Sequence, residues 1–224
     1  MTVDDILKRV LRKLDDEVGV LTSNNRWKPS EIIDEYANTV QKELCRLCRG
    51  LIVDSSTAND GQTVLLPVCS LAIVANTTTY VLSPYVKEIH RIKLALGTRP
   101  LIRKTVAWLD RYRSGWEDEA AGDPIIWVPD LDNNKITLVP PPAATDTAKL
   151  TVYRLPLITL ASSTRTVSPE IPLEYHEDMI SGILQLCFEK NDEETFRPQL
   201  AAKYEAQHMR NIERINRELI KRLF

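Results

Sequence analysis

The stretch that decides the fold is residues 51–94, LIVDSSTANDGQTVLLPVCSLAIVANTTTYVLSPYVKEIHRIKL. It is rich in Val, Ile, Thr and Leu, which favour the pleated, half-buried surface of a sheet. Turn residues divide it at Asn59-Asp60-Gly61 and again at Asn76. The composition and the turns together predict several short strands.

The β-rich character continues downstream of this stretch. A short helix is predicted over Thr105–Tyr112, followed by strands over Ile125–Val128, Ile136–Val139 and Leu150–Arg154. Three consecutive prolines, 140–142, end the second of these strands because proline lacks the N–H that a strand ladder needs.

Helical patterns precede the β-rich region. Apolar residues recur at helical spacing from Val3 to Val18 and predict an amphipathic first helix that ends near Gly19. A second helix is predicted to start at Pro29, a residue favoured at the first helical position. The polar loop 22–25 would join the two into an antiparallel hairpin.

Helical periodicity returns after the β-rich region. It marks a third helix around His176–Cys187 and a continuous helix from Gln199 to Phe224. Helices, then strands, then helices is an α+β order, because parallel βαβ folds alternate instead. We therefore predict an N-terminal helical hairpin (1–50), a central antiparallel β region (51–170) and C-terminal helices (171–224). The hairpin and the C-terminal helices would pack as a bundle in one compact domain, with the long terminal helix as an extension.

The composition is that of an ordinary globular protein, with 43% hydrophobic and 27% charged residues and a formal net charge of −2. No stretch approaches the roughly 18–20 apolar residues that span a bilayer. Proteins that grip nucleic acid over their whole surface are usually basic, so the charge balance argues against that class.

The sequence offers no convincing metal or catalytic motif. Cys45 and Cys48 have C-x-x-C spacing, but zinc would need a second ligand pair, and Cys69 and Cys187 lie far apart. We expect four reduced, mostly buried thiols in a cytosolic setting, and no catalytic residue, metal or cofactor. An enzyme such as a murein hydrolase remains an alternative for which no paired catalytic acid can be identified.

The terminal helix carries the most functional information. Its apolar stripe is narrow, its net charge is +3, and residues 170–194 carry −7. At 1.5 Å per residue it would span on the order of 40 Å. It could pack on its own domain, dock on another protein, or lie on a membrane surface. For docking, the expected contact residues are Arg210, Arg214, Ile215, Arg217, Leu219, Ile220, Lys221, Arg222, Leu223 and Phe224.

A second charged region lies in the β-rich part of the chain. Its cations could face DNA phosphates, although acidic residues that follow could pair with them. The candidate DNA-facing residues are Arg99, Arg103, Lys104, Arg111 and Arg113. The four tryptophans have neighbours typical of packing rather than of stacking platforms for bases.

Several short motifs, in order, resemble those of phage head–tail adaptor (connector) proteins. Arg26-Trp27 followed by residues 31–38, EIIDEYAN, is similar to the family's R-W-x-x-x-E-L-L-x-x-L-N helix. Residues 124–127 followed by 136–142 resemble P-x-x-Y … x-L-x-P-P-P. Residues 171–175, IPLEY, resemble I-P-L-P-x-x-Y. The long charged tail after Tyr204 departs from the family pattern.

The resemblance implies a structural virion protein that joins the portal ring of a phage head to the tail. It implies a ring of about twelve copies, assembled in the host cytoplasm, at the head–tail junction. The C-terminal helix would reach the portal protein, tail or nozzle proteins would lie below, and genomic DNA would pass through the lumen without sequence-specific binding. The acidic and basic segments could pair between neighbouring copies. A tail-completion or tail-tube protein, or a DNA-binding module, are the alternatives.

Overall fold

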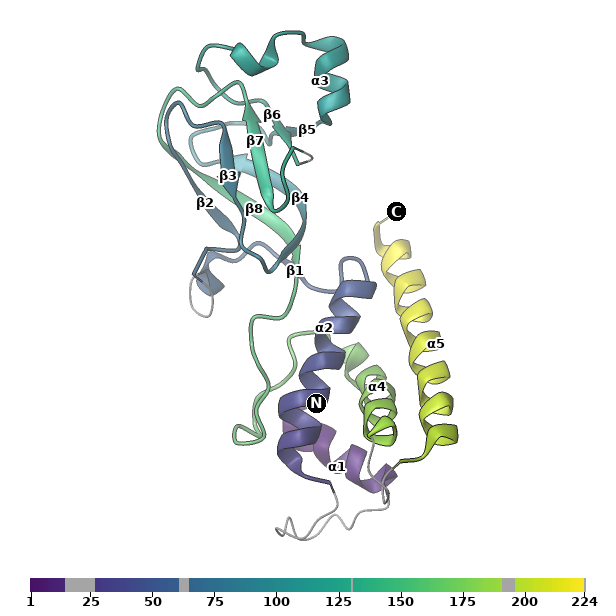
Figure 1. Cartoon of the computed structure of the whole chain (residues 1–224). Helices are drawn as coiled ribbons and strands as arrows, with labels where there is room; N and C mark the ends of the chain where they lie inside the picture. The colour runs from purple at the N-terminus through teal and green to yellow at the C-terminus, as the bar shows by residue number, and fades with distance from the viewer. Residues whose placement is uncertain (15–26, 61–64, 130, 191–195, 224) are drawn as a thin grey trace. The chain divides into compact units, whose positions relative to one another are not determined.

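Figure 1 shows the computed structural model, which describes residues 1–14, 27–60, 65–129, 131–190 and 196–223. The chain forms two compact units. The first, here the helical unit, combines Met1–Ile52 with Leu155–Phe224. The second, here the β unit, is Val53–Arg154. Helices in one unit and sheets in the other confirm the predicted α+β class.

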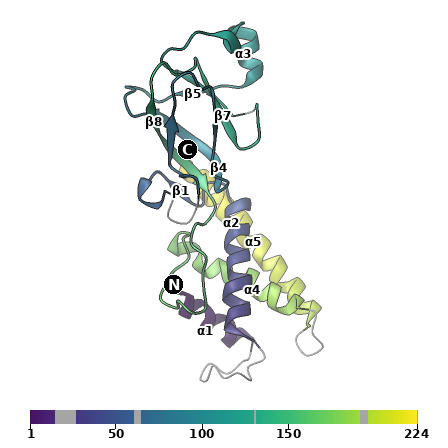
Figure 2. The ribbon, with the colours of Figure 1, turned by 60° about the vertical axis from the view of Figure 1, so that its left-hand side comes forward.

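The helical unit is a bundle with a single core (Figure 2). Its elements are α1 (Val3–Lys13), the π-helical turn η1 (Glu31–Ala37), α2 (Asn38–Leu47), the short η4 (Leu173–Tyr175), α4 (His176–Glu189) and α5 (Pro198–Leu223). Buried apolar side chains from both ends of the chain meet in this core. The predicted packing of the N-terminal hairpin with the C-terminal helices is therefore confirmed.

Local sequence signals place most helix starts. Helical structure begins at Pro29, as predicted, and α5 begins at Pro198, one residue before the predicted start. Thr2 caps α1 by accepting from the Asp5 N–H, and the Asp5 carboxylate accepts from the Thr2 N–H in return. The end predicted for the first helix near Gly19, and the loop 22–25, lie outside the described residues.

The central element of the bundle is α4, whose side chains are buried on almost every side. A helix that is apolar around most of its circumference belongs in the middle of a bundle. It packs against α1, η1, α2 and α5. The N- and C-terminal parts of the chain thus depend on one another for their core.

The irregular segment 155–172 is tied to η1 and α2 by hydrogen bonds, of which the two between Asn38 and Leu160 are buried. The Asn38 amide donates to the Leu160 carbonyl at 2.8 Å, and its oxygen accepts from the Leu160 N–H at 2.8 Å. Asp34 accepts from the Ser162 N–H at 2.6 Å. These bonds satisfy backbone groups that a long loop would otherwise leave unpaired.

The β unit contains two small sheets. In the first, β8 (Asp146–Arg154) lies between β4 (Val86–Leu94) along one edge and both β1 (Val53–Asp54) and β2 (Ser70–Ile73) along the other, all antiparallel. The second has the order β3 (Thr79–Val81), β7 (Lys135–Val139), β6 (Ile126–Val128), β5 (Ile102–Arg103), with β5 and β6 parallel. The other elements are η2 (Thr57–Asn59), α3 (Val106–Tyr112) and η3 (Trp116–Asp118).

Most predicted strands are present, with shifted boundaries. β6 and β7 start within one residue of the predicted Ile125 and Ile136, whereas β8 starts at Asp146, four residues before the predicted Leu150. The turn at Asn76 is confirmed, since its φ is 60°. Asparagine tolerates this left-handed backbone better than most residues.

The β unit begins and ends at one pair of strands. Val53 in β1 lies opposite Tyr153 in β8. Beside this pair, the Arg154 Nε donates to the Asp54 carboxylate at 2.6 Å, and both side chains are less than a tenth exposed. Burial alone would raise the pKa of Asp54, but hydrogen bonds from the Ser56 N–H and Arg154 lower it below its ordinary value.

Candidate interaction surfaces

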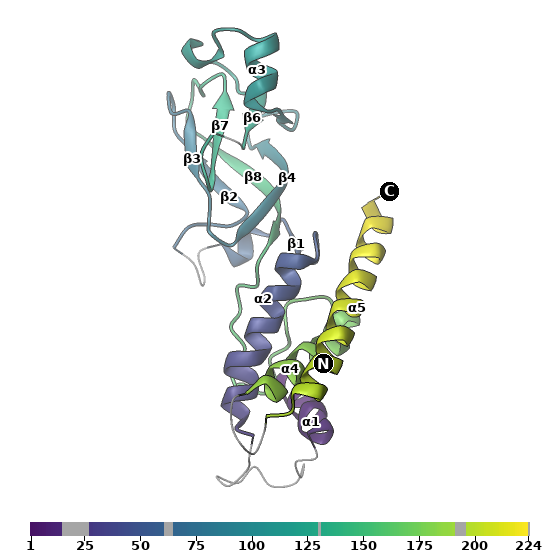
Figure 3. The same cartoon turned by 45° about the vertical axis from the view of Figure 1, so that its right-hand side comes forward.

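The inner face of α5 is covered by its own bundle. Ala201, Ile212, Ile215 and Leu219 are buried there, and α5 runs beside α4 (Figure 3). Ile215 and Leu219 were among the expected partner contacts, yet they are only 0% and 8% exposed. The reason is their spacing of three to four residues, which places them on the stripe that faces the core. Along this face, intramolecular packing accounts for the apolar residues.

The crossing of α4 and α5 is unusually tight at one point. Gly182 faces the ring of His208, and Val40 of α2 lies against the same spot. His208 is 2% exposed, and its Nε2 lies 3.5 Å from a Glu43 carboxylate oxygen. A glycine therefore allows a bulky ring to fit between three helices.

Ion pairs hold the C-terminal half of α5 against the start of α4 and the short η4 that precedes it. Arg214 donates to both Asp178 oxygens at 2.7 Å and to Glu218 at 2.9 Å. Arg222 pairs with Glu174 at 2.9 Å. The hydrogen bond from Arg214 lowers the pKa of Glu218. In this structure the acidic and basic segments thus pair within one chain, whereas the sequence suggested pairing between neighbouring copies.

The outer face of α5 remains exposed. Arg210, Arg217, Ile220 and Lys221 all lie on it. The backbone of α5 ends at Leu223, but the side chain of Leu223 and the whole of Phe224 lie outside the described residues. α5 therefore has an apolar face that its own unit covers and a charged face that it does not.

The basic cluster of the β unit is interleaved with aromatic rings. Arg103 lies 5.6 Å from the Trp127 ring centre and 3.4 Å from a Glu88 oxygen. Lys104 lies 4.1 Å from the ring centre of Trp108. Such cation–π contacts hold the cations in place while leaving their charge exposed.

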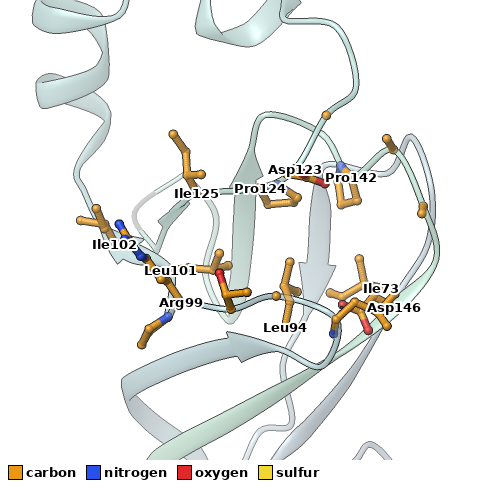
Figure 4. Close-up of a pocket in the computed structure, with 17 residues that line it drawn as sticks. Ile73, Leu94, Arg99, Leu101, Ile102, Asp123, Pro124, Ile125, Pro142 and Asp146 are labelled. Atoms are coloured by element: carbon orange, nitrogen blue, oxygen red, sulfur yellow. The ribbon is translucent and has the colours of Figure 1, made fainter.

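The five candidate DNA-facing residues do not have equivalent surroundings. Arg111 is exposed and lies 5.3 Å from the Tyr112 ring centre. Arg113 instead donates to both oxygens of Glu119, at 2.5 and 2.8 Å, so its charge is largely neutralised. Arg99 lies away from these rings, in the groove shown in Figure 4.

That groove has a volume of about 570 Å³ and a mainly aliphatic lining. Ile102 and Ile125 lie at its rim, and Leu96 also lines it; all three are more than half exposed. The Asp146 carboxylate accepts from the backbone N–H groups of Leu96 and Thr147, so it holds the loop rather than facing a ligand. Among the described lining residues there is no histidine, cysteine or serine beside a carboxylate. Sequence patterns gave no signal for this groove, because its walls come from loops far apart in the chain.

The sequence matches the family described as SU10 adaptor protein over residues 1–222. The chain belongs to the SU10 adaptor family. No curated protein matches the sequence. The predicted relationship to phage adaptors is thus confirmed, and the chain is a phage adaptor protein, a component of the virion.

The four cysteines of the adaptor are buried, free thiols. Burial raises the pKa of both Cys69 and Cys187 to about 12, which keeps these thiols protonated and unreactive. Within the described residues, no three His, Cys, Asp or Glu side chains gather as metal ligands would. In the same part of the chain, every helix is too short or too polar to cross a bilayer.

Proposed function

We propose that this adaptor joins the portal ring of a phage head to the tail and forms part of the DNA conduit. The observation that supports this role best is the outer face of α5. Its cations and Ile220 are exposed on a helix that is firmly held on its other side. A helix that is fixed by its own unit and still presents charge is suited to docking on a second protein.

The proposed portal contacts are the exposed residues near the end of α5. They are Arg210, Arg214, Arg217, Ile220, Lys221 and Arg222, with Leu223 and Phe224 beyond them. Ile215 and Leu219 are buried, so they would contribute to the contact indirectly, by packing α5 against the rest of the bundle.

A truncation tests portal binding. Deleting residues 210–224 would remove all the expected contacts at once, but it would also remove Ile212, Ile215 and Leu219 from the core and destabilise the bundle. Deleting residues 220–224 leaves those core side chains in place. We expect this shorter variant to keep its helical circular dichroism but to lose co-sedimentation with the purified portal protein. Normal co-sedimentation of a folded variant would contradict portal docking through this end.

The ring is part of the same proposal. Copies would associate by head-to-tail contacts, as closed rings require, with tail or nozzle proteins below. We expect native mass spectrometry to detect monomers alone and a ring of about twelve copies only when portal is added. A tail-completion or tail-tube protein would instead assemble with a tail protein in the absence of portal.

A DNA-facing role for the β unit is a second proposal. Arg99, Lys104 and Arg111 are its main candidates. Arg103 is a weaker one because it lies 3.4 Å from a Glu88 oxygen, and Arg113 is left out because it is paired with Glu119. Weak retardation of a DNA duplex that vanishes with modest salt would fit a conduit that DNA slides through. Tight binding with a steep salt dependence would favour a dedicated DNA-binding module instead.

A further inference from the structure

Five cationic side chains lie along one side of α5. They are Lys203, Arg210, Arg214, Arg217 and Lys221. At 3.6 residues per turn they fall within about 60° of one another around the helix axis and extend over about 27 Å. The line lies opposite the buried stripe of Ala201, Ile212 and Leu219. We call it the basic ridge.

Four of the five ridge cations have no acidic partner among the described residues. Arg210 donates to the Gln207 amide oxygen at 3.2 Å, and Arg217 donates to the Glu213 backbone carbonyl at 3.4 Å. Lys203 lies 5.6 Å from the Tyr204 ring centre. Arg214 differs, since it is already paired with Asp178 and Glu218. The available charge of the ridge therefore comes from the other four.

An apolar pair flanks the ridge on one side. Met209 is 47% and Ile220 is 55% exposed, and their separation of eleven residues places them on nearly the same line. A nucleic-acid backbone is anionic, and the sugars between its phosphates offer only a small apolar surface. A protein surface can supply carboxylates and aliphatic side chains in adjacent rows. The combination of ridge and apolar pair thus favours a protein partner over DNA.

We infer that the basic ridge docks on an acidic protein surface that carries an adjacent apolar strip. The four available cations, at 203, 210, 217 and 221, repeat every one or two helical turns. Carboxylates repeated along one face of a partner helix can match that spacing, so an acidic helix is the partner of best fit. The inference rests on the proposed function, in which that surface belongs to the portal, and it adds the chemistry by which the portal would be recognised.

The test compares two charge-matched variants of the full chain. Arg210→Glu with Arg217→Glu reverses two ridge positions and leaves Arg214 and the core unchanged. Arg12→Glu with Lys42→Glu makes the same charge change at exposed positions on α1 and α2. Binding of each to purified portal protein is measured over a range of salt concentrations. We expect the ridge variant to bind on the order of tenfold to a hundredfold more weakly and the control to bind like the original chain.

Further measurements separate the remaining outcomes. Met209→Ser with Ile220→Ser should weaken portal binding without changing its salt dependence. If the original chain binds portal and the ridge variant binds equally well, the ridge is not the contact and the inference is wrong, while the proposed function stands. If the original chain does not bind portal at all, both are wrong. If the ridge variant instead loses binding to a DNA duplex of about 30 base pairs, the partner is nucleic acid and the inference is overturned.

Discussion

Single residues determine how closely two helices of this adaptor pack against each other. At Gly182, a side chain would place its Cβ 2.9 Å from the His208 ring and 3.0 Å from a Val40 methyl group. Contacts this short force a neighbour to move. The absence of one methyl group therefore sets the distance between α4 and α5.

Gly182→Ala should destabilise the protein, although alanine normally stabilises a helix relative to glycine by roughly 0.5–1 kcal/mol. Overpacking against His208 and Val40 should outweigh that gain and give a net loss of about 1–2 kcal/mol. Urea denaturation measures the change. In a His208→Ala background the same substitution should cost less or become stabilising. If Gly182→Ala lowers the free energy of unfolding equally in both backgrounds, the new methyl group does not clash with the His208 ring.

A buried histidine should make stability depend on pH. His176 is 3% exposed, and its Nε2–H donates to the Ile171 carbonyl at 2.8 Å. Burial lowers the pKa of His176 below its ordinary value of 6.5. The unfolded chain therefore binds this proton more readily than the folded one.

The free energy of unfolding should accordingly be highest above pH 6.5 and should fall as the pH drops below that value. Denaturation midpoints at about pH 7.5 and about pH 5.5 would measure the slope. His176→Gln keeps a donor for Ile171 but has no proton to gain in this range. It should flatten the slope, and a variant with an unchanged slope would assign the effect to other groups.

At the scale of the elements, β1 and β8 are held together by more than their short ladder. The buried Asp54–Arg154 pair lies beside the Val53–Tyr153 pairing, where the chain enters and leaves the β unit. Removing one member of such a pair leaves the other charge buried without a full set of partners.

Asp54→Ala should therefore destabilise the β unit by about 3–5 kcal/mol. Replacing both members by apolar residues of similar size, Asp54→Leu with Arg154→Met, should recover most of that loss. Thermal unfolding followed by tryptophan fluorescence reports mainly on this unit, because it contains three of the four tryptophans, Trp108, Trp116 and Trp127, whereas Trp27 lies in the helical core. A double variant as unstable as the single one would mean that the pair itself is needed.

The sequence predicted elements well where the signal was local. Helical structure starts at Pro29 as predicted, and the short helix predicted over Thr105–Tyr112 is present as α3. The periodicity of α5 also placed Ile215 and Leu219 on one apolar stripe. What it could not predict depends on residues far apart in the chain. The parallel pairing of Ile102 with Ile126 and the bond from Arg214 to Asp178 are examples. Helical periodicity places Ile215 on an apolar stripe, but it does not determine whether a partner protein or the chain's own core covers that stripe.

At the scale of the whole molecule, the β unit is an insertion between the two parts of the helical unit. The helical core contains residues from both sides of it, Leu51 and Ile52 before and Leu160 and Ile171 after. Because Val53 and Tyr153 lie opposite each other on paired strands, a short turn can replace everything between them.

A chain in which a short Gly-Ser turn replaces residues 53–154 should therefore fold. We expect strong helical circular dichroism and one cooperative unfolding transition, because the core of the helical unit is complete without the insertion. Its unfolding is followed by ellipticity during urea titration. A chain that stays unfolded or aggregates would show that the β unit is needed to form the helical core.

The same strand pair has a mechanical consequence. The backbone passes twice between the helical unit and the β unit, once before Val53 and once after Arg154. These two connections join the β unit at neighbouring positions, because Val53 pairs with Tyr153. Tension between the two units is then shared by two backbones and pulls both ends of the insertion in the same direction, so it does not peel β1 from β8. A single linker would let one unit spin freely about the other, whereas a double tether resists torsion.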